Sequence, residues 1–311
     1  MNSAETRIDS SIVVPFVIFT VIWGGTWIVI RDQLGVVPAQ WSIAYRFLIA
    51  AVAMAALTRW KGESLRLGAA GLLTAAMLGF LQFVVNFTAV YMAEHHITSG
   101  LVATVFALLL IPNSLLAWAF LGQRPSSRFA WGSLLAVAGI SLLFVHELRE
   151  HPARSDAIVI GIGLTLVGLM GASAANVFQA RDRVRRFPLF ALLTWAMLIG
   201  AIMNAAIALA FSGPPVIEMR LGYWLGLAYL GVFASALAFS LYLPVVRSIG
   251  PGKAAYSSML VPIIAMGFST WLEDYRWTPL AAGGAVLALG GMVFALAGRR
   301  RPQLVTAPDA G

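Results

Sequence analysis

The sequence predicts an all-α membrane protein with ten transmembrane helices, arranged as two five-helix repeats of opposite orientation. Three observations support this fold class. Of the 311 residues, 60% are hydrophobic and 11% are charged, which is more apolar surface than one soluble core can bury. The apolar residues fall into ten runs, and Lys and Arg gather in alternate loops between them. The two halves also share residues at a nearly constant spacing.

Each apolar run holds about 18–25 residues, enough to cross about 30 Å of hydrocarbon as an α-helix. The runs are 11–30, 38–58, 68–92, 98–120 and 128–145, then 157–179, 188–211, 222–246, 251–271 and 279–297. Because the connections are short, consecutive helices are expected to be antiparallel. Residues 11–145 then form the first repeat, 146–156 a periplasmic linker, 157–298 the second repeat and 299–311 a cytoplasmic tail.

The positive charges predict the orientation of the chain. If the loops are assigned alternately to two sides, 15 of the 21 Lys and Arg residues fall on one side and 5 on the other. Cytoplasmic loops are enriched in Lys and Arg, so both termini are expected in the cytoplasm. The first ten residues lack a basic segment and a cleavage site, so we expect the first helix to act as an uncleaved signal.

Composition also excludes several kinds of partner. The formal net charge of +8 is spread between apolar runs rather than gathered on one face, so it favours membrane orientation over nucleic-acid binding. The chain has no cysteine, and its four histidines show no metal-ligand spacing. We therefore expect no nucleic acid, no metal and no cofactor.

The two halves are interpreted as internal repeats. The matched pairs are Pro38/Pro188, Gly100/Gly250 and Pro112/Pro262 at a spacing of 150, Gly132/Gly283 and Gly139/Gly290 at 151, and Gly79/Gly231 and Phe87/Phe239 at 152. Each half holds an odd number of helices, so the second half must enter the membrane from the opposite side. Such an inverted repeat is typical of transporters that work by alternating access.

Two prolines at equivalent positions predict where the transport site lies. Pro112 interrupts the fourth run and Pro262 the ninth, and a proline removes one helical hydrogen bond. Broken helices at matching positions of two halves are typical of a binding site near the bilayer midplane. We expect the helices to pivot at four glycines, which are Gly79, Gly100, Gly231 and Gly250.

Polar side chains inside the predicted helices are candidates for a substrate cavity, because each costs free energy in lipid unless it is paired. They are Gln82, Asn86, Thr104, Asn113, Ser173, Asn176, Tyr242, Tyr256 and Ser257. Trp23 joins them as a deep aromatic surface for stacking. For each residue alone, a structural bond between helices is the alternative interpretation.

Charged residues favour uncoupled transport of a net-neutral solute. All thirteen acidic residues fall at helix ends or in loops, so no buried carboxylate is expected to carry protons. Glu94 and His95 are the remaining candidates for coupling. Arg46 is the only charge away from the ends of a run; it either binds a substrate carboxylate or has a structural role, reaching the interface or bonding to backbone carbonyls.

Several motifs resemble a known family. Leu121-Gly122-Gln123-Arg124 is similar to the L-G-E-R signature of the EamA domain, and Trp23-Gly24 and Tyr45-Arg46-Phe47 resemble motifs of its first two helices. In the second copy, Trp271-Leu272-Glu273-Asp274 keeps only the acidic position, and Ala196 replaces the arginine. The chain resembles ten-helix members of the drug/metabolite transporter superfamily, most closely the YddG-type exporters of aromatic amino acids.

This resemblance implies a multi-pass exporter in a bacterial-type inner membrane. Its substrates would be aromatic and other neutral amino acids, with methionine, threonine and xenobiotics as further candidates, and its partners that substrate and the lipid bilayer. The cavity would lie between helices one, three, four, six, eight and nine, with helix two at the periphery, and we expect a monomer. The alternatives are a nucleotide-sugar or phosphate-ester carrier, a multidrug carrier, and a membrane-embedded enzyme; no catalytic constellation appears in the spans.

Overall fold

The computed structural model describes residues 10–242 and 257–297, and within these ranges the chain contains helices and no strand. The elements of the first half are α1 (Ser10–Gln33), α2 (Ala39–Trp60), α3 (Ala69–Leu78), η1 (Gly79–Asn86), α4 (Phe87–Glu94), α5 (Ser99–Phe106), η2 (Ala107–Leu109), α6 (Leu110–Leu121), α7 (Ser127–Glu150) and η3 (Pro152–Arg154). The second half contains α8 (Ser155–Gln179), α9 (Asp182–Arg185), α10 (Leu189–Ser212), α11 (Leu221–Ala228), η4 (Tyr229–Leu237), α13 (Ser257–Leu272) and α14 (Pro279–Ala297).

The long helices correspond to the apolar runs. Among the described residues, eight helical stretches are long and apolar enough to cross a membrane, and two shorter apolar helices follow at Leu260–Leu272 and Pro279–Ala295. Four of the eight are composite. One stretch contains α3, η1 and α4, a second α5, η2 and α6, a third η3 and α8, and a fourth α11, η4 and the helical residues 238–242. The chain is therefore a multi-pass membrane protein.

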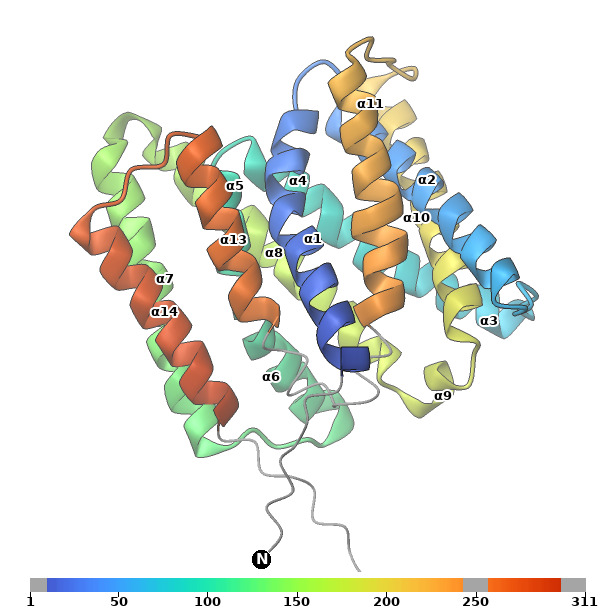
Figure 1. The fold of residues 1–311 in the computed structure, drawn as a ribbon, viewed down its shortest axis with the longest axis horizontal. Helices are drawn as coiled ribbons and strands as arrows, with labels where there is room; N and C mark the ends of the chain where they lie inside the picture. Colours follow the sequence, from blue (N-terminus) through green and yellow to red (C-terminus); the bar gives the residue numbers. More distant parts are fainter. Residues whose placement is uncertain (1–9, 243–256, 298–311) are drawn as a thin grey trace, which may run out of the picture.

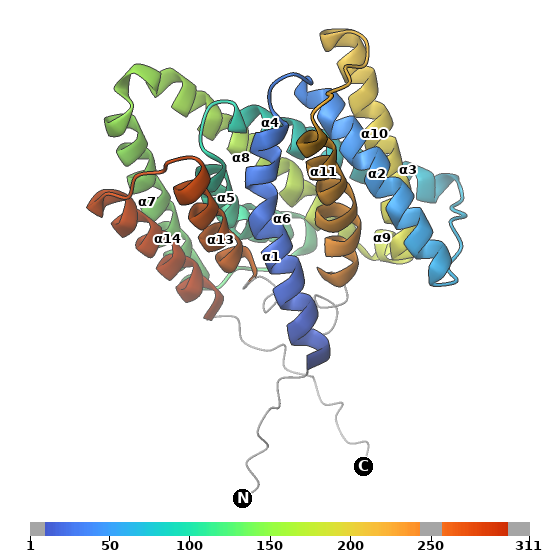
Figure 2. The same cartoon turned by 45° about the horizontal axis from the view of Figure 1, so that its top comes forward.

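The helices form one bundle with two distinct edges (Figure 1). Helices α7 and α14 lie side by side at one edge, α2 and α10 pack together at the other, and α1, α5 and α13 lie between them. The first turn of α1 and the last turn of α14 lie at the same end of the bundle (Figure 2). The connections from α7 to α8, from α10 to α11 and from α13 to α14 lie at the opposite end.

Glycines bring α7 and α14 into backbone contact. A Cβ atom at Gly132 would lie 2.5 Å from the carbonyl oxygen of Gly291, and one at Gly139 would lie 2.5 Å from that of Gly284. Gly284 follows Gly132 by 152 residues, and Gly291 follows Gly139 by 152 residues. A shift of 152 residues between the halves therefore converts each of these two contacts into the other. The neighbouring Gly290 has open space around its Cβ position, so packing supports a spacing of 152 here rather than 151.

A second pair of contacts shows the same symmetry between the halves. A Cβ atom at Gly79 in η1 would lie 2.6 Å from the carbonyl oxygen of Ala196 in α10. One at Gly231 in η4 would lie 3.0 Å from the carbonyl oxygen of Arg46 in α2. Ala196 follows Arg46 by 150 residues and Gly231 follows Gly79 by 152. The contact between the third and seventh predicted helices is therefore equivalent to the contact between the eighth and second.

Both halves contain a π-helical segment at the same place. η1 covers Gly79–Asn86 and η4 covers Tyr229–Leu237, which begins 150 residues later. A π-helical segment inserts an extra residue into the helical ladder and is frequent at functional sites. The pivots predicted at Gly79 and Gly231 thus lie where the helix departs from α geometry.

The two prolines differ in their effect on the helix. Leu108, whose carbonyl would have accepted the hydrogen bond that Pro112 cannot donate, lies in the 3₁₀ segment η2. The expected break in this helix is thus present one turn before Pro112. Pro262 lies inside α13, which is assigned as α-helix from Ser257 to Leu272. Unlike the helix that contains Pro112, this helix shows no 3₁₀ segment next to its proline.

Two other expectations are refined by the structure. Helix α7 continues to Glu150 and α8 begins at Ser155, so much of the segment expected as a linker is helical. His146 is buried in α7, where its Nδ1 atom lies 3.0 Å from the hydroxyl oxygen of Thr278.

A Cβ atom at Gly100 would lie 2.7 Å from the Cβ of Ser269, so Gly100 permits the close approach of α5 and α13.

Candidate substrate-binding site

A row of aromatic side chains joins α1 to the two π-containing helices. Trp23 lies 5.0 Å from Tyr242 and 5.6 Å from Phe239, measured between ring centroids. Phe239 lies 6.4 Å from Phe83, which lies 6.4 Å from Phe87. We call Trp23, Tyr242, Phe239, Phe83 and Phe87 the aromatic row. Such spacings are typical of interacting aromatic rings, so these side chains form one continuous surface.

A hydrogen bond fixes the orientation of Trp23 in the aromatic row. Its Nε1 atom donates to the carbonyl oxygen of Ala234 at 3.1 Å. Ala234 lies in η4, whose π geometry displaces carbonyl groups from the regular α-helical pattern. The predicted contribution of Trp23 to an internal surface is therefore consistent with its position between α1 and η4.

Arg46 lies at the far end of the aromatic row. Its guanidinium carbon lies 4.4 Å from the ring centroid of Phe87 and 5.3 Å from that of Phe47, both within the range of cation–π attraction. Its Nε atom donates to the Ser235 hydroxyl oxygen in η4 at 3.3 Å. The residue is only 1% exposed, so it does not reach the interface. The interpretation that Arg46 snorkels to the surface is wrong.

The charge of Arg46 lacks a direct counter-ion. It forms no ion pair with a carboxylate of the residues that the structure describes, and its Nη1 atom has no hydrogen-bond partner among them. An unpaired charge inside a membrane protein is costly and marks a functional position. Helix two, expected at the periphery, thus places the charged side chain of Arg46 inside the bundle.

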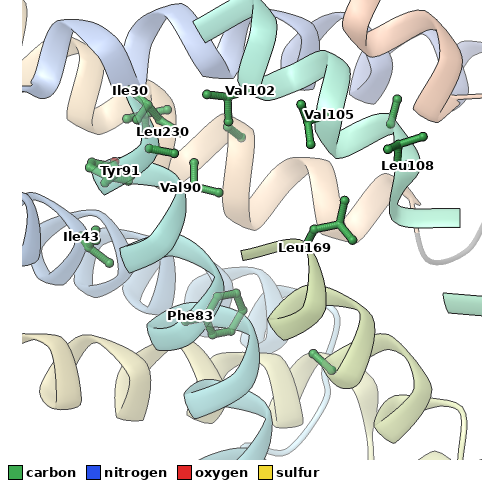
Figure 3. Close-up of a cluster of buried hydrophobic side chains, with 14 of the residues drawn as sticks. Ile30, Ile43, Phe83, Val90, Tyr91, Val102, Val105, Leu108, Leu169 and Leu230 are labelled. Atoms are coloured by element: carbon green, nitrogen blue, oxygen red, sulfur yellow. The ribbon is translucent and has the colours of Figure 1, made fainter. Parts of the chain in front are cut away.

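Two further polar residues, Tyr91 and Glu94, are buried on α4. Both are 0% exposed. The Tyr91 hydroxyl and both carboxylate oxygens of Glu94 have no hydrogen-bond partner among the described residues. Figure 3 shows Tyr91 in the buried cluster that also holds Ile30, Ile43 and Leu230. The expectation that the spans offer no buried carboxylate is therefore wrong, because Glu94 closes α4 within the core.

Polar contacts hold several helix ends together at one end of the bundle. The Glu273 carboxylate accepts hydrogen bonds from the backbone N–H of Ser99 at 3.1 Å and from its hydroxyl at 2.6 Å. Arg31 lies 3.7 Å from the same carboxylate. Arg220 donates to Asp32 at 2.8 Å. These contacts tie α1, α5, α11 and α13 together at the end opposite the first turn of α1.

Histidine 95, the other candidate for proton coupling, lies outside the spans in the connection between α4 and α5. Burial and the positive charges of Arg31 and His96 lower its pKa below the ordinary value of 6.5. Its imidazole is thus mainly neutral at neutral pH. It is exposed, unlike Glu94, so the two neighbouring candidates have different environments.

The other predicted cavity residues fall into several places. Asn113 and Asn176 come together, with Asn176 donating to Asn113 at 3.4 Å. Gln82, Asn86 and Ser173 are buried where η1 and α8 pack together. Of these, the Asn86 side-chain oxygen and the Ser173 hydroxyl have no partner among the described residues.

Thr104 has a different position. Its hydroxyl donates to the Gly100 carbonyl at 2.7 Å, and the side chain borders a groove of about 690 Å³ between α13 and α14 that Pro262 also lines. The groove walls include the exposed Ile263 and Val286, as expected of a lipid-facing surface. Tyr256 and Gly250 lie outside the described residues, as does the side chain of Ser257.

Sequence reasoning missed Tyr91 and undervalued Arg46 and Glu94. Arg46 was visible as the only charge away from the ends of a run, but the direction in which its side chain points depends on packing against η4. Tyr91 and Glu94 are three residues apart and so share a helix face. That spacing could have indicated Tyr91 and Glu94 together as candidate site residues.

The family model of the EamA-like transporter family matches residues 11–145 and 159–297. The chain belongs to the EamA-like transporter family. The two matched segments correspond to the two halves whose contacts are described above, so the EamA-like transporter repeats account for nearly the whole chain.

Two of three relatives of this EamA-like transporter are named as a transporter or an efflux pump. The "uncharacterized inner membrane transporter YedA" of Escherichia coli (strain K12) is 28% identical over 285 residues, covering 89% of this chain and 86% of the relative. The "probable amino-acid metabolite efflux pump" of the same organism is 24% identical over 290 residues, covering 90% and 93%. Protein PagO of Salmonella typhimurium is 21% identical over 265 residues, covering 85% and 84%.

A solved crystal structure shows the same fold as this EamA-like transporter. It aligns with a TM-score of 0.67 at 21% sequence identity and covers 94% of this chain and 99% of the other. At this identity the likeness concerns the fold alone.

Proposed function

We propose that this EamA-like transporter exports neutral amino acids and prefers aromatic ones. The observation behind this proposal is the aromatic row, which ends at the buried Arg46, a side chain with no ion-pair partner among the described residues. An aromatic amino acid combines a ring, which stacks on such a surface, with a carboxylate, which an arginine binds with charge-assisted hydrogen bonds. The amino-acid metabolite efflux pump among the relatives supports the same substrate class.

The charges inside the spans argue against phosphorylated substrates. A nucleotide sugar or phosphate ester has two or more negative charges and calls for several buried cations. Arg46 is the only Lys or Arg in the interior of a predicted run, since Arg128 and Lys253 lie within the first three residues of theirs. One arginine suits the single carboxylate of an amino acid.

Export of cationic compounds is the second candidate function, and Glu94 favours it. Transporters of cations use a carboxylate inside the membrane, and Glu94 is fully buried without a partner among the described residues. Arg46, whose field reaches Glu94, opposes a bound cation. We therefore favour a net-neutral substrate that carries both a positive and a negative group.

The proposed architecture has ten transmembrane helices in two inverted repeats, residues 11–145 and 157–298, with 146–156 between them on the outer side and 299–311 in the cytoplasm. The exchangeable contacts of Gly132 with Gly291 and of Gly139 with Gly284 support the pseudo-symmetry. The excess of Lys and Arg in one set of loops supports cytoplasmic termini in a bacterial inner membrane. We propose a monomer as the transporting unit.

The proposed mechanism is alternating access around the aromatic row. The contacts of Glu273, Arg31 and Arg220 hold helix ends together at one end of the bundle. Their release would open that end, with bending at the π-helical segments η1 and η4. Gly79 and Gly231 allow those segments to move against α10 and α2 without side-chain obstruction.

The test is uptake of labelled solutes into proteoliposomes containing the purified protein, with and without an imposed pH difference. The panel includes phenylalanine, leucine, glutamate, a sugar phosphate and a quaternary ammonium compound. We expect phenylalanine to enter fastest, leucine more slowly, and glutamate and the sugar phosphate at the rate of empty liposomes. Uptake of only the sugar phosphate or only the quaternary ammonium compound would replace the proposed function.

A further inference from the structure

We propose that Arg46, Tyr91 and Glu94 together bind the zwitterionic backbone of the transported amino acid, an inference that rests on the proposed function. Arg46 and Tyr91 would bind the α-carboxylate, and Glu94 would bind the α-ammonium group. The starting point is four buried polar atoms without a hydrogen-bond partner among the described residues. They are Nη1 of Arg46, the hydroxyl of Tyr91 and both carboxylate oxygens of Glu94.

The three side chains lie in one region of the core. Tyr91 and Glu94 are three residues apart on α4 and therefore share one face of that helix, and α2, which contains Arg46, packs against α4. The charges of Arg46 and Glu94 both act on the Tyr91 hydroxyl, and Glu94 is affected by Glu273 and Arg31 more strongly than by Arg46. This region of the core thus contains a guanidinium, a hydroxyl and a carboxyl group.

The site has the charges that a zwitterion needs. A carboxylate binds guanidinium and hydroxyl donors, and an ammonium group donates to carboxylate oxygens. Arg46 and Glu94 do not neutralise each other through an ion pair, which leaves each free for a ligand group of opposite charge. A ligand lacking one of its charges would leave one protein charge buried and unpaired, at a large cost.

The other charges near Glu94 already have partners. Glu273 and Arg31 also act on Glu94. The Glu273 carboxylate is bound by Ser99 and approached by Arg31 at 3.7 Å. The neighbouring His95 is exposed. Glu94 is therefore distinct among these groups in having neither a partner nor exposure.

The aromatic row gives the site a direction. Arg46 contacts Phe87 at the end of the row, and Phe87 and Tyr91 are four residues apart on α4. An amino acid whose backbone binds at Arg46 and Glu94 can therefore direct its side chain along Phe87 and Phe83. Arg46, Tyr91 and Glu94 are at most 1% exposed, so the substrate enters when the packed helices separate.

Counterflow of labelled phenylalanine in proteoliposomes loaded with unlabelled phenylalanine tests the site. Competitors are phenylalanine, phenylalaninamide, which lacks the carboxylate, and N-acetylphenylalanine, which lacks the ammonium group. For the unaltered protein, we expect each analogue to compete at least about tenfold less well than phenylalanine, since each loses one charge-assisted interaction.

Three variants assign the charges to individual residues. Glu94→Gln should weaken competition by phenylalanine about tenfold while N-acetylphenylalanine changes little, so that the two become similar. Arg46→Gln should also weaken competition by phenylalanine about tenfold, while competition by phenylalaninamide changes little, so that these two compounds become similar. Tyr91→Phe should weaken competition by phenylalanine by a smaller factor. Glu147→Gln is the matched control, because Glu147 is also a buried carboxylate, 7% exposed and in α7, and should leave all ratios unchanged.

The outcomes separate this inference from the proposed function. Phenylalanine counterflow with equal competition by all three compounds would overturn the zwitterion site and leave the proposed function standing. The same holds if Glu94→Gln and Glu147→Gln give identical ratios. Absence of counterflow with every neutral amino acid would overturn the proposed function and the site together. Membrane abundance and thermal unfolding of each variant show whether a loss of flux reflects misfolding.

Discussion

The carboxylate of Glu273 binds the first turn of α5 through Ser99, 174 residues earlier in the chain. It accepts the backbone N–H and the hydroxyl of the same residue, so it satisfies a group that the helix N-terminus leaves free. Arg31 of α1 lies 3.7 Å from this carboxylate. Three helices from both halves of the sequence thus meet at one side chain, at the end of the bundle opposite the first turn of α1.

Replacing Glu273 should loosen this end. Glu273→Gln removes the charge that binds Ser99 and attracts Arg31, a loss of about 1.5–3 kcal/mol for charge-assisted bonds. Because the chain has no cysteine, Ile97→Cys, introduced at a residue 5% exposed, reports opening without background. We expect thiol labelling of Ile97→Cys from the outer side to rise about tenfold with Glu273→Gln. Asp274→Asn, at the exposed neighbouring carboxylate, is the control; equal labelling in both backgrounds would contradict the closure.

The glycines between α7 and α14 should be sensitive to a single methyl group. In Gly139→Ala the new Cβ would lie 2.3 Å from the backbone nitrogen of Ala288, so the helices must separate. Overpacking of this kind costs about 1–3 kcal/mol, which should lower the unfolding temperature in detergent. Gly290→Ala, which meets nothing within 4 Å, should leave it unchanged or raise it slightly. A larger loss at Gly290 than at Gly139 would show that the packing register is wrong.

Pro112 and Pro262 should differ in importance for transport. Pro112 follows the 3₁₀ segment η2, whereas Pro262 lies within a helix that remains α-helical. We expect Pro112→Ala to restore a regular helix and to lower the counterflow rate several-fold at unchanged membrane abundance. Pro262→Ala should have the smaller effect. If both variants lose rate and abundance in parallel, the prolines serve folding alone.

The aromatic row should determine the preference for aromatic over aliphatic amino acids. Phe87→Leu removes the ring that lies next to both Arg46 and Phe83, and a lost aromatic contact is worth about 0.5–1.5 kcal/mol. We expect the ratio of phenylalanine to leucine counterflow to fall by about two- to tenfold. Phe129→Leu, at a buried ring in α7, controls for general destabilisation. An unchanged ratio in Phe87→Leu would remove the row from the substrate path.

The apolar runs could be predicted closely because hydrophobic length is a property of the local sequence. Predicted and observed ends agree within a few residues for α2, α8 and α10. The register between helices could not be predicted in the same way. Gly283 and Gly284 are adjacent, as are Gly290 and Gly291, and only the packed helices show which member of each pair faces α7.

The site was predicted less completely, because burial of a charged residue depends on tertiary packing. Glu94 ends its helix, a position that usually meets solvent, yet α4 places it in the core. Arg46 was discounted because helix two was expected at the periphery, but contact with η4 turns its side chain inward. The sequence did identify Trp23 and Tyr242, which lie together in the aromatic row.

Release of phenylalanine from cells tests the central claim most directly. Cells deprived of their own aromatic exporters are loaded with a phenylalanine-containing dipeptide, and phenylalanine is measured in the medium over time. We predict faster release from cells producing this protein than from cells producing Arg46→Gln at equal membrane abundance, with no difference in release of glutamate. Equal phenylalanine release from the two strains would contradict export through a site that contains Arg46.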